Sequence, residues 1–240
     1  MIKAYALTDV GKTRMVNQDY VYCTNRPVGS LPNLYIVADG MGGHKAGDLA
    51  SRFSVQTFVE TVKHSKSDNP ITIISDAIKY TNTKLLELAA TSPDYTGMGT
   101  TFVVATIVGS SLYVANVGDS RLYVLADDFR QVTRDHSLVE EMVNNGTIDR
   151  AEARTHERRN VITRAIGGDK DVMADFFEVE VTPGNEILMC SDGLSSMVED
   201  VQLAGVLTSK APLNEKAEQL VNAANEYGGR DNISLIIIEP

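Results

Sequence analysis

Short apolar runs of strand length recur along the chain, and they limit its possible folds more than any other feature. They are rich in Val, Ile, Tyr and Phe and are bounded by Gly, Ser, Asn or Asp, which favours strands over helices. The runs are 34–38, 101–108, 112–117, 121–125, 186–190 and 233–238. A tight turn at 109–111 joins the runs 101–108 and 112–117, and the run 121–125 follows directly. We therefore predict an antiparallel meander of these three strands.

Amphipathic helical periodicity separates these groups of strands. Apolar residues at three- and four-residue spacings predict helices around 49–62, 74–88, 138–143 and 217–224. Gly146 is the expected C-cap position of the third helix. No repeat and no Pro- or Gly-rich linker divides the chain. Helices inserted between groups of strands indicate α+β layers that share one core, so we expect a single domain over residues 1–240.

The composition and charge exclude several classes of protein. Hydrophobic residues make up 43% and charged residues 22%, as in an ordinary globular protein. No apolar run approaches the roughly 18–20 residues that a membrane span needs, and the N-terminus does not resemble a signal peptide. The two cysteines, Cys23 and Cys190, cannot form a disulfide framework, so we expect a cytoplasmic protein without a membrane partner. A net charge of −10 argues against nucleic acid as a partner.

Five aspartates lie in turns or at the ends of predicted strands. They are Asp19, Asp39, Asp119, Asp192 and Asp231. One Asp-Gly pair is ordinary turn composition, but several strand-end carboxylates can converge on one rim of a sheet. Such like charges raise one another's pKa, and cations between them relieve the repulsion. Oxygen ligands without a Cys/His cluster favour Mg²⁺ or Mn²⁺, and Gly40 can offer its carbonyl because it has no side chain. The pattern predicts a divalent-cation site and specifies no reaction.

The segments around these aspartates resemble the ordered motifs of the metal-dependent protein phosphatases, the type 2C or PPM family. They are DGMGGH at 39–44, GDSR at 118–121, SDGL at 191–194 and GRDN at 229–232, with RMVNQD at 14–19 and NVITRAIG at 160–167. The motifs follow the family's order over essentially the whole chain, and the compact length is similar to its bacterial branch. The resemblance implies a four-layer α-β-β-α sandwich of two antiparallel sheets flanked by helices.

The resemblance also implies a binuclear centre with two Mg²⁺ or Mn²⁺ ions per chain. Asp39 would bridge both ions, and the Gly40 carbonyl would bind one of them. Asp192 and Asp231 would complete the first ion's shell, while Asp19 would hold the second ion through water. Two ions about 3.5–4 Å apart share a water and direct it in line at phosphorus. The implied reaction is direct hydrolysis of phosphoserine or phosphothreonine on proteins.

Four more residues receive roles at matching positions. Arg14 is the expected phosphate clamp, although alone it would be taken for a surface arginine. His44 is the expected proton donor to the departing Ser or Thr oxygen, although a lone histidine is more often structural. Asp119 is similar to the ligand of a weaker third ion in bacterial members; the alternative is a turn aspartate paired with Arg121. Asn232 is expected to orient its neighbouring aspartate or local backbone.

One basic segment runs against the net charge. Five arginines lie in it: Arg150, Arg154, Arg158, Arg159 and Arg164. An exposed, salt-bridged helix or loop is the ordinary explanation. The resemblance instead places a variable flap at about 145–165 beside the metal centre, where basic side chains could help to hold a phosphoprotein.

Three functions remain compatible with the sequence. The first is a monomeric phosphatase that acts on phosphorylated proteins and opposes a cognate Ser/Thr kinase. The second is a catalytically weak relative that binds phosphoproteins, and the presence of Asp39, Asp192 and Asp231 together argues against it. The third is another two-metal phosphoesterase, such as a nuclease. The acidic net charge and the lack of a basic, aromatic-lined channel argue against that. We expect the first function.

Overall fold

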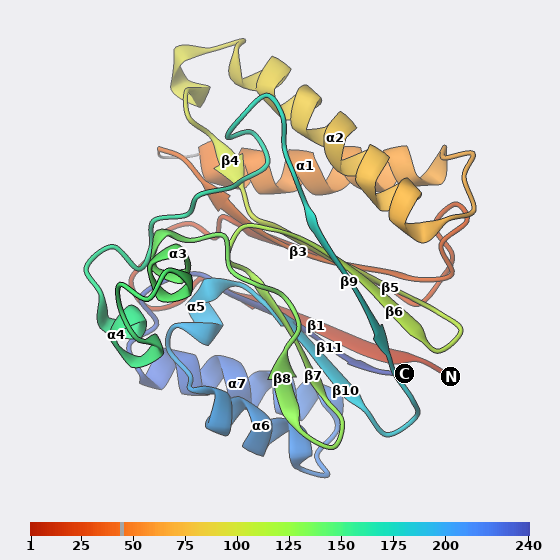
Figure 1. Ribbon diagram of the computed structural model, residues 1–240, viewed down its shortest axis with the longest axis vertical. Helices are drawn as coiled ribbons and strands as arrows, with labels where there is room; N and C mark the ends of the chain where they lie inside the picture. The colour runs from red at the N-terminus through yellow and green to blue at the C-terminus, as the bar shows by residue number, and fades with distance from the viewer. Residues whose placement is uncertain (44–45) are drawn as a thin grey trace.

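Two antiparallel sheets form the centre of the computed structural model, which describes residues 1–43 and 46–240 (Figure 1). The first sheet has the order β1 (Lys3–Asp9), β11 (Ile233–Glu239), β10 (Glu186–Cys190), β7 (Arg121–Leu125) and β8 (Phe129–Gln131). The second has the order β2 (Asp19–Thr24), β3 (Leu34–Met41), β5 (Phe102–Val108), β6 (Ser111–Val117) and β9 (Asp175–Glu180), with the short β4 (Gly99–Thr100) paired to the end of β3.

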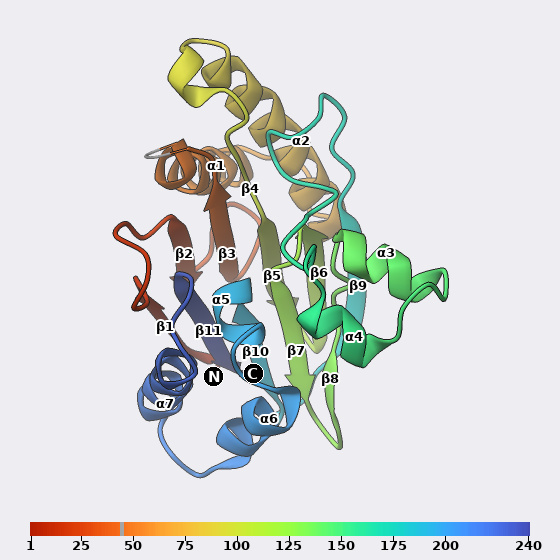
Figure 2. The ribbon, with the colours of Figure 1, turned by 90° about the vertical axis from the view of Figure 1, so that its left-hand side faces the viewer.

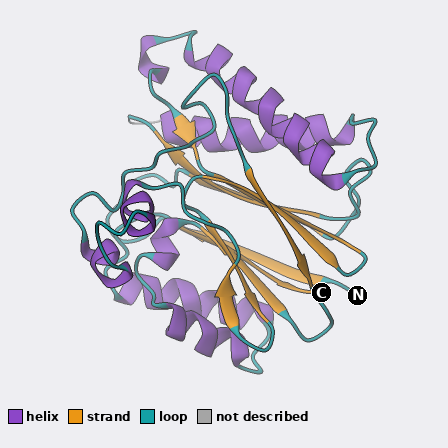
Figure 3. Ribbon diagram, viewed as in Figure 1, coloured by secondary structure: helices purple, strands orange, loops and turns teal. Residues whose placement is uncertain are grey.

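Helices cover the outer face of each sheet (Figure 3). The second sheet is covered by α1 (Ala46–Lys63) and α2 (Pro70–Ala89), and the first by α5 (Asp192–Ser195), α6 (Asp200–Thr208) and α7 (Leu213–Glu226). Two short helices, α3 (Leu138–Asn144) and α4 (Arg150–Thr155), lie at one end, and a 3₁₀ turn spans Pro93–Tyr95. The predicted α-β-β-α sandwich is confirmed. No helix among residues 1–43 and 46–240 is long and apolar enough to cross a membrane.

The central strands are buried on both faces, which explains their continuous apolar runs. In β3, Tyr35 and Val37 face the other sheet, whereas Leu34, Ile36 and Ala38 face α1 and α2. This two-residue alternation divides one strand between two apolar layers. The strands β1 and β9 lie at edges and are only partly buried, so their sequences lack such a run and they were not predicted.

The predicted meander is wrong in its third strand. The hairpin of β5 and β6 is present, but β7 belongs to the other sheet, between β10 and β8. The chain leaves β6 through Gly118, whose φ is +107° and where an added Cβ would lie 2.7 Å from the Thr101 Cβ atom. Glycine is therefore required at this crossover. The crossover places Asp119 where the two sheets meet.

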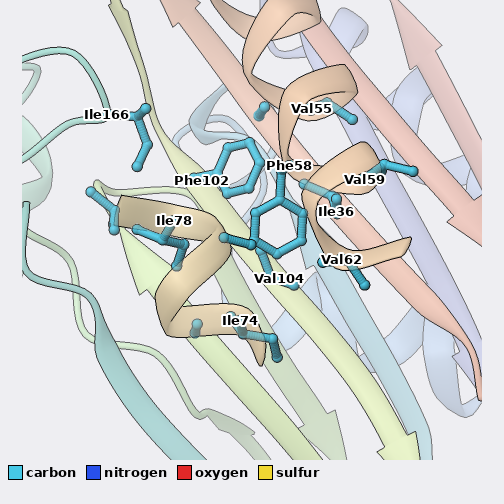
Figure 4. Packing of buried hydrophobic residues seen from close by; sticks show 14 of the residues in the cluster. Ile36, Val55, Phe58, Val59, Val62, Ile74, Ile78, Phe102, Val104 and Ile166 are labelled. Carbon is cyan, nitrogen blue, oxygen red and sulfur yellow. The ribbon is translucent and has the colours of Figure 1, made fainter. Parts of the chain in front are cut away.

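The layer between the helices and the second sheet yields a stability prediction. Phe58 of α1 is fully buried, and its ring centroid lies 5.2 Å from that of Phe102 (Figure 4). Phe58→Ala should lower the free energy of unfolding by about 3–5 kcal/mol because it leaves a cavity. Ile71→Ala, at a 39% exposed position on α2, should change it by less than about 0.5 kcal/mol. Urea denaturation measures both, and equal losses would contradict the packing of this layer.

Candidate metal centre

The five predicted aspartates come together at the junction of the two sheets. Asp19 and Asp39 are directly opposite each other on β2 and β3 of the second sheet. Asp119 follows β6 of the same sheet at the crossover. Asp192 begins α5 just after β10, and Asp231 comes just before β11, so both lie at strand ends of the first sheet. Each sheet therefore contributes carboxylates to one cluster.

Burial and mutual repulsion raise the pKa values of Asp19, Asp39 and Asp192. Burial raises the pKa of Asp39 well above its usual value, and the negative charges of the other four aspartates raise it further. Burial likewise raises the pKa of Asp19 to about 7, with the charges of Asp192 and Asp231 adding to the effect. The pKa of Asp192 is raised first by burial and then by Asp231. The cluster thus favours protons or cations over free negative charge.

Two carboxylate oxygens in the cluster are buried without a hydrogen-bond partner among the described residues. They are Oδ1 of Asp19 and Oδ1 of Asp192. The other Asp19 oxygen accepts a hydrogen bond from the Ser191 hydroxyl at 2.7 Å, and that hydroxyl accepts one from the Ser234 N–H at 3.0 Å. Buried carboxylate oxygens without donors are costly unless a proton or cation satisfies them. Their presence fits a divalent-cation site made of oxygen ligands.

The backbone at Gly40 is compatible with a carbonyl ligand. An added Cβ at Gly40 would lie 2.0 Å from the Gly47 carbonyl oxygen, so β3 and the start of α1 are in close backbone contact. An added Cβ at Gly47 would lie 2.7 Å from the Gly40 carbonyl oxygen. Side chains at these two positions would therefore displace the backbone or cover this carbonyl.

Two threonines hold the backbone of Asp39. The Asp39 N–H donates to the Thr101 hydroxyl oxygen at 2.9 Å, and the Thr100 hydroxyl donates to the Asp39 carbonyl oxygen at 2.9 Å. The Thr101 hydroxyl also lies 2.7 Å from that of Ser120, beside Asp119. Sequence reasoning missed these residues, because no local pattern marks a threonine that binds a strand far away in the chain.

Arg14 lies at the rim of the cluster in an ion pair. Its Nη2 donates to Oδ2 of Asp231 at 2.8 Å, and the arginine side chain is about half exposed. The other Asp231 oxygen accepts from the Asn232 N–H at 2.8 Å. In this arrangement no group of three acidic, histidine or cysteine side chains among the described residues could hold an ion by itself. An ion on Asp231 and a phosphate on Arg14 would both require this pair to separate.

Asn232 ties the Arg14 loop to the first sheet, as the sequence predicted for local backbone. Its Oδ1 accepts from the Gln18 N–H at 2.8 Å, and its Nδ2 donates to the carbonyls of Val10 and Val16 at 2.9 and 3.0 Å. The side chain is 3% exposed. These three bonds fix both ends of the loop that carries Arg14.

The alternative role for Asp119, pairing with Arg121, is wrong. The Arg121 guanidinium binds Asp135 instead, with Nη2 2.7 Å from Oδ2 and Nε 3.0 Å from both oxygens. Burial raises the pKa of Asp119 well above its usual value, followed by the charges of Asp192 and Asp135, and Arg121 only partly opposes them. Asp119 therefore belongs electrostatically to the aspartate cluster.

A buried histidine that the sequence analysis did not select holds the turn before Asp119. The His136 N–H donates to the Gly118 carbonyl at 2.9 Å, and the Gly118 N–H donates to His136 Nδ1 at 3.1 Å. Its Nε2 lies 3.2 Å from Oδ2 of Asp175. Because Nδ1 accepts a bond, neutral His136 carries its proton on Nε2. The predicted proton donor, His44, lies outside the described residues.

Comparisons with known proteins agree with this geometry. The model of the family described as Protein phosphatase 2C matches residues 11–236. The serine/threonine phosphatase stp of Listeria innocua is 39% identical over 241 residues, which cover 97% of this chain and 93% of that protein. The solved S. agalactiae serine/threonine phosphatase has a TM-score of 0.92 and 35% identity, covering 100% of this chain and 99% of that one. The catalytic domain of the phosphatase PstP, solved with two manganese ions, has a TM-score of 0.87 and 30% identity, covering 99% and 97%.

The raised pKa of Asp19 predicts a pH-dependent stability for the metal-free protein. Its pKa rises from 3.8 to about 7 on folding, so its contribution is most favourable at low pH and is lost as the pH rises through 7. Asp19→Asn keeps an acceptor for Ser191 and removes the charge. In urea denaturation, the metal-free variant should be more stable than wild type at pH 8, by an amount that shrinks by about 2–3 kcal/mol at pH 5. An effect independent of pH, or matched by the exposed Asp127→Asn, would contradict this.

Proposed function

The chain belongs to the protein phosphatase 2C family, and from this membership we propose how its aspartate cluster removes phosphate from phosphoserine and phosphothreonine in proteins. The chain is a metal-dependent serine/threonine phosphatase, and its metal ions are Mg²⁺ or Mn²⁺. The observation that carries the assignment of the site is the burial of carboxylates from both sheets at one junction, with two oxygens that have no protein donor among the described residues.

We assign the two ions to the residues that sequence analysis selected. Asp39, Asp192, Asp231 and the Gly40 carbonyl would hold them, with Asp39 shared between both. The raised pKa of Asp39 supports its place among the other charges of the cluster. When bound, a pair of such ions supplies an activated water and neutralises the charge of the phosphate.

Two further aspartates act around this pair. Asp19 would hold the second ion through water, and the Ser191 hydroxyl orients its carboxylate. Asp119 would hold a third, weaker ion, and His136 fixes its turn through Gly118.

The chain's own cationic groups bind and protonate the substrate. Arg14 binds the phosphate with its guanidinium fork, at the rim where it now contacts Asp231. Asn232 holds the backbone of the loop that carries it. His44 donates a proton to the departing serine or threonine oxygen, which leaves poorly as an alkoxide.

The remaining proposals concern the domain organisation of the enzyme, its location in the cell and its partners. Residues 1–240 form one catalytic domain, and the family match over 11–236 supports this. A flap at about 145–165 contains α4. We place the protein in the cytoplasm as a monomer that opposes a cognate Ser/Thr kinase, in keeping with two cysteines that are both free.

The function is tested by metal-dependent turnover of three substrates. A phosphothreonine peptide and p-nitrophenyl phosphate should be hydrolysed with Mn²⁺ and an oligonucleotide should not, and excess chelator should stop turnover reversibly. Asp192→Asn should reduce kcat by more than about 100-fold, because even outer-shell partners of metal ligands cost 10- to 100-fold. Asp127→Asn, an exposed carboxylate in the turn after β7, is the control. Full activity in chelator would exclude the metal mechanism, and binding without turnover would identify a phosphoprotein-binding relative.

Asp119→Asn tests the third ion. The substitution should leave two ions bound and reduce kcat for a phosphopeptide by about tenfold or more. The melting temperature of the metal-free protein should stay or rise, because a buried like charge is removed and Arg121 remains paired with Asp135. Metal stoichiometry, melting temperature and kcat are measured on one preparation. An unchanged kcat with a lower melting temperature would contradict the assignment.

A further inference from the structure

A cavity of about 740 Å³ lies between the flap and the body of the protein, next to the aspartate cluster. Asp119 and Asp192 form part of its wall on one side, and Arg154 and Arg159 of the flap line it on another. Figure 2 shows α4 to one side of β7, and Arg154 of α4 contacts the carbonyl of Ser195 at the end of α5. A phosphorylated residue held at the aspartates would therefore bring its neighbours in the substrate chain to this cavity.

Three arginines of the cavity wall form no ion pair with any described residue. They are Arg134, Arg154 and Arg159. Arg154 Nη2 donates only to the Ser195 carbonyl and Arg159 Nη1 only to the His156 carbonyl, both at 3.4 Å. The positive charges of these three guanidinium groups are therefore not neutralised at the cavity wall by any described carboxylate.

The other arginines of this region behave differently. Arg121 and Arg150, which also line the cavity, are neutralised by Asp135 and Glu140. Arg158 lies 4.0 Å from Glu157 and outside the wall. Salt bridges therefore account for Arg150, Arg158 and Arg164 of the basic segment, but not for Arg154 and Arg159.

Charge within the cavity is unevenly distributed. Glu199 and Asp200 line it at the start of α6, so its walls are not uniformly positive. The unpaired positive charge of the flap comes from Arg154 and Arg159, and Arg134 adds to it from the loop after β8. An anion is therefore favoured on the flap side of the cavity.

We infer that this cavity is a subsite for an anionic side chain of the phosphoprotein substrate, near the residue being dephosphorylated. The inference rests on the proposed function and adds a substrate preference to it. A guanidinium fork binds a carboxylate or a phosphate through two parallel hydrogen bonds. The cavity volume lies within the roughly 300–1,000 Å³ range of ligand pockets. The three arginines counteract the repulsion that an acidic peptide meets from an acidic protein.

The test compares phosphothreonine peptides that differ at a single residue. This residue is Glu, Gln, Lys or phosphoserine, and it is placed in turn at each position from two to four residues before or after the phosphothreonine. At one position, wild type should show a kcat/KM for the Glu peptide about 5- to 10-fold above that for the Gln peptide, which is the net value of an ordinary hydrogen bond. Arg154→Gln and Arg159→Gln should each bring this ratio towards one, and Arg154→Glu should favour the Lys peptide. Arg158→Gln, in the same segment but outside the cavity, should keep the wild-type ratio.

Ratios within each variant do not depend on the amount of active enzyme, so partial misfolding does not affect them. A preference for Glu assigns the subsite to carboxylates, and a preference for phosphoserine with Glu equal to Gln assigns it to a second phosphate. No anion preference in wild type, or one that all the cavity variants retain, overturns the inference. Wild-type turnover of p-nitrophenyl phosphate with Mn²⁺ separates that failure from failure of the proposed function, which would abolish this turnover as well.

Discussion

Repulsion among five aspartates at the junction of two sheets is the constraint on which the rest of the structure depends. Burial alone raises the pKa of Asp39, and four neighbouring charges raise it further. The fold must hold these groups together against that repulsion. It does so with apolar layers on both faces of the central strands, so that moving one strand end would disturb two cores. The stability of the sandwich thus offsets the unfavourable energy of the site.

The groups that position Asp19, Asp39 and Asp119 are neutral and come from other elements of the fold. Ser191 binds Asp19, Thr101 binds the backbone of Asp39, and His136 binds the turn before Asp119. None of these partners neutralises the cluster, because Ser191 orients the Asp19 carboxylate and the other two hold the backbone at Asp39 and before Asp119. Orientation and charge are therefore supplied by different residues, as expected of a site built to bind cations.

Much of the fold and the identity of the aspartates could be predicted from the sequence, and the physical reasons are specific. Strands buried on both faces carry continuous apolar runs. A carboxylate directly after such a run does not contribute to the apolar core, and this identifies it as a candidate site residue. The edge strands β1 and β9 lack such a run because they are only partly buried. The meander failed because strand pairing depends on the crossover at Gly118, which local spacing does not encode. The same limit explains why Ser191 and Thr101 were missed.

The ion pair between Arg14 and Asp231 connects the binding of phosphate with the binding of metal. In the proposed reaction Arg14 binds the phosphate and Asp231 binds a metal ion. When neither ligand is bound, the 2.8 Å contact between the two side chains pairs their opposite charges. Because Asn232 holds the loop of Arg14 while its own N–H binds Asp231, the two groups remain adjacent when their direct contact opens. If Asp231 bound a cation, the Arg14 guanidinium would be free at the place where the phosphate of the substrate would bind. The two binding events are therefore expected to favour each other, since each removes the competitor of the other.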